Sequence, residues 1–180
     1  MSKAPTIDSN QWYHMYVTTG PDQALIGNNP NKDGLTAAVS VNTTNLTSPT
    51  NRWQIFPINA TTYALRCQCN GPEAWLGTKT GVNAETAPYL AQANISDTSA
   101  FWSIGSWGDD YWWLSNAANG TSLLSKKGDD FLEMARSIAG PNNGRKWKFD
   151  RIAAINDAQY SSVNVRNPLG HVESLWSLTV

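Results

Sequence analysis

The sequence has few of the residues that mark membrane proteins, secreted disulfide-rich proteins and enzymes. Its 180 residues include only two cysteines and two histidines. No run of about 18 apolar residues is present, so no segment is predicted to span a bilayer. The first residues lack the apolar stretch of a signal peptide. We therefore expect a cytoplasmic protein, or one exported without a signal peptide; an extracellular fragment of a longer protein is the alternative.

Positive charge is neither abundant nor clustered. The formal net charge is -1, from 13 basic and 14 acidic residues, and the basic residues are scattered. A nucleic-acid partner is not predicted, because nucleic-acid-binding proteins concentrate basic charge on one face. Cys67 and Cys69 are two positions apart, so on a strand they would share a face without the geometry of an easy disulfide. We expect buried reduced thiols; a metal-binding pair is the alternative, although a second ligand pair is missing.

Sequence motifs of common enzyme classes are missing as well. There is no phosphate-binding glycine loop, no His-Glu-x-x-His, no Gly-x-Ser-x-Gly and no Cys-x-x-Cys. His14 and His171 are far apart, and the pattern places no nucleophile beside either of them. The acidic pairs are typical of turns rather than of the two carboxylates of a glycosidase. We expect a protein without catalytic activity, cofactor or metal.

Aromatic residues, in contrast, are abundant. Nine Trp, six Tyr and four Phe stand among many Asn, Thr, Ser and Gly residues, a mixture typical of strands joined by turns. Long runs of helix-forming residues are missing. The hydrophobic fraction is 41%, which for this length indicates one core. The composition predicts a single all-β domain.

Three segments repeat one pattern of four strands, over about residues 12–58, 62–107 and 111–152. Each opens with an alternating aromatic strand, continues with a short apolar strand and a weaker third strand, and ends with a strand centred on Trp. Three columns keep spacings of 45 to 50 residues: Met15, Leu65 and Leu114; Ile26, Leu76 and Leu124; and Trp53, Trp102 and Trp147. An internal repeat of this kind determines the architecture.

The apolar residues of the repeat alternate every second position, which excludes helical solenoids and places one face of each strand in a core. Three blades are too few to close a propeller. Three four-stranded units can instead close a barrel with no unpaired edge. The Trp column is then predicted to fill the core, where losing one such ring to Ala typically costs roughly 3–5 kcal/mol.

Over residues 12–152 the chain resembles the ricin-B-like β-trefoil lectin family, especially its fungal-type members. Each repeat of that family ends with Gln-x-Trp; the corresponding tripeptides here are Asn51-Arg52-Trp53, Ala100-Phe101-Trp102 and Arg145-Lys146-Trp147, which keep the Trp but not the Gln. The resemblance implies an all-β β-trefoil of three pseudo-symmetric four-stranded repeats closing a barrel, plus a C-terminal tail. It also implies non-catalytic carbohydrate binding, with glycans or glycoproteins as partners.

The resemblance implies that each sugar site combines an acidic side chain, an amide and an aromatic ring. The first repeat has Asp22 and Asn51 but no ring near its third strand, so it is a poor site. The second repeat is preferred and the third ranks next. The residues predicted to bind carbohydrate are Glu73, Trp75 and Tyr89 in the second repeat, and Asp129, Asp130, Phe131 and Asn143 in the third.

A secondary patch is predicted at Trp107, Asp110 and Trp113, because the aromatic rings crowded there cannot all be interior and exposed aromatics often mark a recognition surface. Structural roles are the alternatives: Asp109-Asp110 and Asp129-Asp130 occupy turn-like positions, and Trp75 can merely cover the end of the barrel. For the whole protein, the alternative function is a trefoil protein-interaction or protease-inhibitor domain, because the fold does not determine the function.

Residues 153–180 fall outside the repeats and form a tail packed on the trefoil or extending from it. It is expected to be a short helix or an extended strap, with a turn at 167–170. The final apolar stretch, 175–180, would support self-association if it were exposed. We therefore expect a monomer or a weak homodimer.

Overall fold

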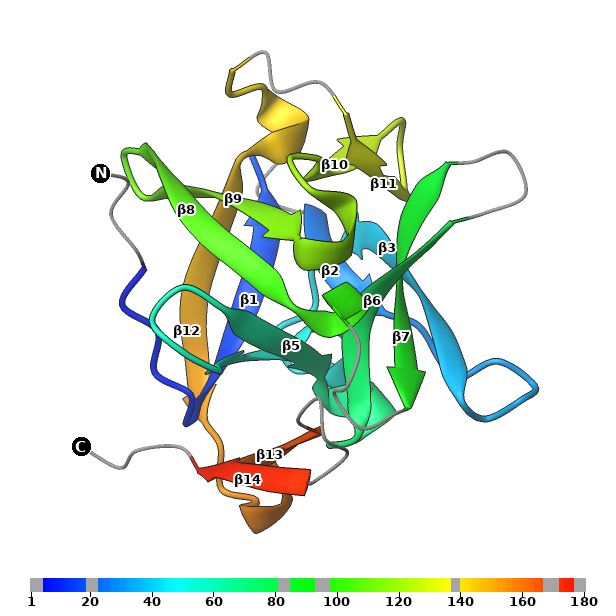
Figure 1. Ribbon diagram of the computed structural model, residues 1–180. Coiled ribbons are helices and arrows are strands. Elements are labelled where there is room, and N and C mark those ends of the chain that lie inside the picture. The colour runs from blue at the N-terminus through cyan, green and yellow to red at the C-terminus, as the bar shows by residue number, and fades with distance from the viewer. Residues whose placement is uncertain are drawn as a thin grey trace.

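The computed structural model (Figure 1) describes residues 5–18, 23–80, 85–92, 98–136, 140–166 and 172–176. Asp22, His171 and the turn expected at 167–170 lie outside these residues. The strands are β1 (Gln11–Val17), β2 (Gln23–Gly27), β3 (Thr36–Thr43), β4 (Trp53–Pro57), β5 (Tyr63–Cys67), β6 (Ala74–Thr80), β7 (Thr86–Gln92), β8 (Trp102–Gly108), β9 (Tyr111–Asn116), β10 (Leu123–Lys127), β11 (Phe131–Ala135), β12 (Trp147–Ala154), β13 (Ser162–Arg166) and β14 (Val172–Trp176). Short 3-10 turns join them: η1 (Pro49–Asn51), η2 (Gln68–Asn70), η3 (Thr98–Ala100), η4 (Ala117–Asn119), η5 (Asn143–Arg145) and η6 (Ala158–Tyr160).

A ring of antiparallel strands closes the barrel. The pairings run β1–β4, β4–β5, β5–β8, β8–β9, β9–β12 and β12–β1. Each repeat adds one hairpin, β2–β3, β6–β7 or β10–β11. In Figure 1, β6 and β7 lie to the right of the barrel strands and next to β3, with which β7 pairs. This is the β-trefoil predicted from the sequence, with four strands in each repeat.

The three Trp residues that begin β4, β8 and β12 occupy equivalent places. Each is fully buried, and each indole N–H donates to a backbone carbonyl of the second strand in its own repeat. Trp53 Nε1 lies 2.8 Å from Leu25 O, Trp102 Nε1 2.7 Å from Leu76 O, and Trp147 Nε1 3.1 Å from Leu124 O. A buried indole needs such a partner for its N–H group. The Trp column is therefore confirmed as the centre of the core.

The other two predicted columns fare differently. Met15, Leu65 and Leu114 are all fully buried, as predicted. In the second-strand column, however, the prediction of Ile26 as the core residue is wrong by one position. Leu25, not Ile26, accepts the Trp hydrogen bond in the first repeat and is fully buried, whereas Ile26 is half-buried. Since side chains alternate along a strand, a slip of one residue exchanges the core face for the outer face.

The barrel strands also present three outer walls on the face opposite the core, each formed by the last strand of one repeat and the first two strands of the next. Wall 2, on β4, β5 and β6, contains the cross-strand pairs Phe56–Ala64 and Arg66–Trp75. Wall 3, on β8, β9 and β10, contains the equivalent pairs Gly105–Trp113 and Ser115–Leu123. Wall 1, on β12, β1 and β2, contains the pairs Asp150–His14 and Tyr16–Ala24.

The tail folds into the short 3-10 helix η6 and the hairpin β13–β14, and the hairpin was not expected from the sequence. Figure 1 shows this hairpin at the bottom of the barrel, below β5. Val163 and Leu175 pack with Phe56, Ala64 and Trp75 of wall 2. The tail therefore covers one outer wall, and β12 itself continues to Ala154 before the tail begins. Among the described residues, no helix is long and apolar enough to cross a membrane.

The two cysteines lie closer together than expected for positions two apart on a strand. The strand β5 ends at Cys67 and the turn η2 begins at Gln68, which brings the Sγ atoms of Cys67 and Cys69 to 3.3 Å. Both thiols are free. Burial raises the pKa of Cys67, whereas the hydrogen bond with Cys67 lowers that of Cys69. Within the described residues, no group of three or more potential metal ligands is found.

Candidate functional site

Trp75, the ring predicted to stack on a sugar, is covered. Its side chain is 3% exposed, and the Arg66 guanidinium carbon lies 4.8 Å from the centre of its ring. The tail hairpin packs against the same cluster through Val163. The prediction of a stacking role for Trp75 is therefore wrong, and the ring has a structural role on wall 2.

Glu73 and Tyr89, the other residues predicted in repeat 2, are not brought into one pocket. Glu73 is exposed and precedes Ala74 at the start of β6, whereas Tyr89 is half-buried and pairs with Gly77. Four residues along a strand span about 13 Å. The Tyr89 ring instead has the Lys79 ammonium group 5.2 Å from its centre.

The residues predicted in repeat 3 are exposed at or near the hairpin β10–β11. Asp129, Asp130 and Phe131 form its turn and the start of β11, and Phe131 is 76% exposed. Asn143 is exposed in η5, where its backbone oxygen accepts a hydrogen bond from Thr18 Oγ1 at 3.2 Å. The turn interpretation fits Asp129 and Asp130, which follow Gly128 with its φ of +63°.

A polar cavity of about 640 Å³ opens at the other end of that hairpin, between repeats 2 and 3. Leu123 pairs with Ala135 at this end, so the residues just before β10 and just after β11 meet there. Repeat 2 contributes Glu85 from the start of the β7 region. The polar side chains that line the cavity are Glu85, Thr86, Asn119, Ser122, Glu133, Arg136 and Arg145.

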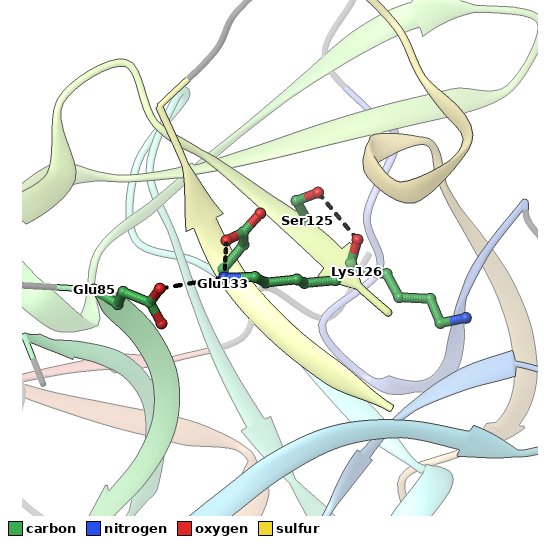
Figure 2. Close-up of polar contacts among 5 residues, drawn as sticks. Glu85, Ser125, Lys126 and Glu133 are labelled. Atoms are coloured by element: carbon green, nitrogen blue, oxygen red, sulfur yellow. Dashed lines mark hydrogen bonds and ion pairs between the residues drawn. The ribbon is translucent and has the colours of Figure 1, made fainter. Parts of the chain in front are cut away.

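Two carboxylates of the cavity are held by one lysine. Lys127 Nζ lies 3.3 Å from Glu85 Oε1 and 3.4 Å from Glu133 Oε2, which joins the two repeats across the opening (Figure 2). These hydrogen bonds raise the pKa of Lys127, with Glu85 as the larger contribution. The lysine is half exposed, so the two ion pairs contribute modestly to stability. Lys127 therefore brings two carboxylates from different repeats near one another at the cavity.

Sequence reasoning missed this cavity. Asn119, Ser122 and Arg136 lie in connections between strands and follow no periodic pattern. One signal was present: the acidic residues Asp22 and Glu73 were predicted from the turn before the second strand of repeats 1 and 2, and in repeat 3 residues 119–122 form that turn. Glu85 belongs to a different repeat, and reading each repeat alone could not associate it with Glu133.

The secondary patch is divided by the structure. Trp107 and Trp113 line one groove of about 280 Å³, whereas Asp110 lines a separate cavity of about 270 Å³ with Trp112. Asp110 has a φ of 60° and Asp109 a φ of 52°, so the pair forms the tight turn between β8 and β9. The two indole rings thus lie in one groove, as predicted, whereas Asp110 is part of the turn.

The Trp107–Trp113 groove has a firmly supported ring at its base. Trp113 pairs with Gly105 across β8–β9, and a Cβ atom at Gly105 would lie 2.1 Å from Trp113 Cζ2. The indole therefore rests directly on the glycine backbone. Trp107 is held by its N–H group, which donates to Arg145 O at 3.2 Å. The remaining lining residues are Ser115, Gly120, Thr121 and Leu123.

The sequence matches no protein-family model and no curated protein. Solved structures with the same fold include a salivary protein of the Cysteine and Tryptophan-Rich family from Culex quiquefasciatus (TM-score 0.61, 17% identity, covering 83% of this chain and 96% of that one). The designed 3-fold symmetric protein ThreeFoil is similar at TM-score 0.60 and 14% identity, covering 77% of this chain and 96% of that chain.

The Polyporus squamosus lectin, bound to the epitope Neu5Aca2-6Galb1-4GlcNAc, is similar at TM-score 0.61 and 13% identity. The match covers 88% of this chain and 52% of the lectin chain. Likeness to this lectin and to the designed threefold protein establishes the β-trefoil fold. At these identities the likeness extends to the fold alone.

Proposed function

We propose that the protein is a non-catalytic carbohydrate-binding module of the ricin-B-like lectin type. The observation that carries this proposal is the polar cavity between repeats 2 and 3. Its carboxylates, Glu85 and Glu133, suit the paired hydroxyls of a sugar, because hydrogen bonds to charged acceptors are the stronger ones. Asn119 and Arg136 add an amide and a donor on the same lining.

The arrangement of charges favours binding over catalysis. A glycosidase needs one carboxyl group as a proton donor and a second as base or nucleophile. Here both carboxylates are ion-paired with Lys127, which suits fixed acceptors. An open site of this kind gives weak affinity for one sugar, and useful affinity then comes from several contacts made together.

The test begins with the full chain on a glycan array, followed by titration calorimetry with the best ligand. Glu133→Gln keeps the shape of the side chain and removes its charge, and Asn119→Ala removes an amide from the lining. Each is expected to weaken binding about tenfold, the cost of one charge-assisted hydrogen bond. Asp129→Asn, an exposed change in the turn of the same hairpin, is the matched control and should bind as the unmodified protein does.

Two results would contradict the proposal. One is an array without any retained glycan, combined with no heat of binding at high ligand concentration; this would favour the protein-interaction or protease-inhibitor alternative. The other is undiminished binding by Glu133→Gln and Asn119→Ala together, which would remove the cavity from the function.

A further inference from the structure

Wall 2 and wall 3 are built on equivalent strands but are filled in opposite ways. On wall 2 the bulky ring is that of Phe56, on the first strand of the pair, and it lies opposite Ala64. On wall 3 the bulky ring is that of Trp113, on the second strand of the pair, and it lies opposite Gly105. Next along the wall, Ser115 replaces the buried Arg66. The tail hairpin covers wall 2, whereas wall 3 keeps the Trp107–Trp113 groove.

The groove adjoins the polar cavity. Asn119 and Ser122 line the cavity, and Gly120 and Thr121, between them in the chain, line the groove. Arg145 contributes to both places, since its side chain lines the cavity and its backbone oxygen holds the Trp107 ring. One turn therefore separates a polar pocket from an aromatic one. A ligand with several linked units, polar at one end, would extend from the first to the second.

We propose that the Trp107–Trp113 groove is a second carbohydrate subsite, which binds the sugar residue next to the one held in the polar cavity. This inference rests on the proposed function. The apolar C–H face of a pyranose packs on Trp113, since an aromatic ring offers a large apolar surface. Ser115 and Thr121 line the same groove, and their hydroxyls bind the hydroxyls of the sugar.

The size and rigidity of the groove favour a sugar ring over a peptide hairpin. Its volume of about 280 Å³ is near the lower limit of small-molecule pockets, roughly 300 Å³. The Trp113 ring rests on Gly105 and the Trp107 N–H group is bonded, so neither ring has to be ordered when a ligand binds. Such preorganisation lowers the cost of binding.

The experiment compares the affinities of the array-selected oligosaccharide and of the single sugar unit that occupies the polar cavity. The unmodified protein should bind the longer ligand about tenfold more tightly, the contribution of one stacked ring. Ser115→Arg introduces the guanidinium that fills the equivalent place on wall 2. It should abolish this gain and leave the affinity for the single unit unchanged, as should Trp113→Ala.

Glu133→Gln, in contrast, should weaken both ligands equally. Trp176→Ala removes an exposed indole, 68% accessible, on the tail hairpin, and serves as the control that should keep the full gain. Circular dichroism and urea unfolding establish that each variant is folded, and Ser115→Arg keeps the test decisive if Trp113→Ala is unstable. The inference is overturned if the gain survives Ser115→Arg, or if the unmodified protein shows no gain. Absence of binding to any glycan defeats the proposed function itself.

Discussion

Wall 2 and wall 3 show how one repeated framework is used in two ways. Both walls are formed by equivalent strand pairs around the shared core, in which Trp53 and Trp102 make equivalent hydrogen bonds. Wall 2 carries Arg66 and receives the tail, whereas wall 3 carries Ser115 and keeps an open groove. The interior residues are constrained by the barrel they fill. The outward residues are not, and the repeats differ there.

Arg66 explains why the tail covers wall 2. It is fully buried, and its guanidinium donates to Gln54 Oε1 at 2.5 Å, to Tyr160 O at 2.7 Å and to Pro72 O at 2.7 Å. Burial lowers the pKa of Arg66 to about 10, so the group stays charged at neutral pH. Its rigid fork of donors suits several carbonyls at once. A serine at the equivalent place on wall 3 offers a single hydroxyl.

The largest expected effect is a loss of stability when Arg66 on wall 2 is replaced. Arg66→Met keeps the length of the side chain but removes the donor to Gln54 Oε1 and to Pro72 O, and one of the two donors to Tyr160 O. Each buried polar group left without its partner costs about 1–3 kcal/mol. Urea denaturation should report a loss of this size in the free energy of unfolding.

The matched change on wall 3 is Ser115→Ala, which should alter the free energy of unfolding by less than about 0.5 kcal/mol, as is usual for surface substitutions. Arg66→Lys should reduce the free energy of unfolding by an amount between those of Arg66→Met and Ser115→Ala, because lysine keeps the charge and loses the fork of donors. Equal losses at Arg66 and Ser115 would show that the walls do not differ in the way described.

A smaller effect tests how the ring is supported on wall 3. Gly105→Ala places a methyl group where Trp113 lies, with 2.1 Å between the new Cβ and Trp113 Cζ2, so the ring must move. Overpacking of this kind costs roughly 1–3 kcal/mol. In a Trp113→Ala background the same change should cost almost nothing. A double-mutant cycle in urea measures this coupling, and additive losses would disprove the contact.

The smallest effect concerns wall 1, which contains the Asp150–His14 pair. His14 is buried and lies 3.3 Å, Nε2 to Oγ1, from Thr44. Burial lowers the pKa of His14, and Asp150 opposes this shift. The unfolded chain therefore binds the proton more tightly. Stability is complete above the unfolded pKa of about 6.5 and decreases as the pH falls from there to the lower folded-state pKa. Urea titrations at several pH values should show this decrease in the unmodified protein but not in His14→Gln.

The interior could be predicted from the sequence because it repeats. The Trp column and the column of Met15, Leu65 and Leu114 follow from spacing alone, and the error at Ile26 arose where two adjacent apolar residues fit the pattern equally well. The walls could not be predicted in this way. Whether Trp75 is open depends on a tail that is distant in sequence and has no repeat of its own.

The candidate site was difficult to predict for a related reason. Its members come from two repeats and from connections between strands, where Glu85 and Arg136 follow no alternation of apolar and polar residues. Bulky residues close in sequence, such as Trp107 and Trp113, were the exception, because nearby positions on adjoining strands must be close in space. Sequence alone indicated that rings gather there. It could not indicate that Gly105 supports one of them.

The distribution of tryptophan gives the molecule two optical reporters. Trp53, Trp102 and Trp147 are sealed in the barrel, so their emission changes only when the whole domain opens. Trp75 is shielded by Arg66 and by the cluster that includes Val163. Release of the tail would expose it to a quencher such as acrylamide while the barrel rings remained protected. Local undocking and global unfolding would therefore differ in the share of indole emission that acrylamide reaches, above the constant share of exposed rings such as Trp176.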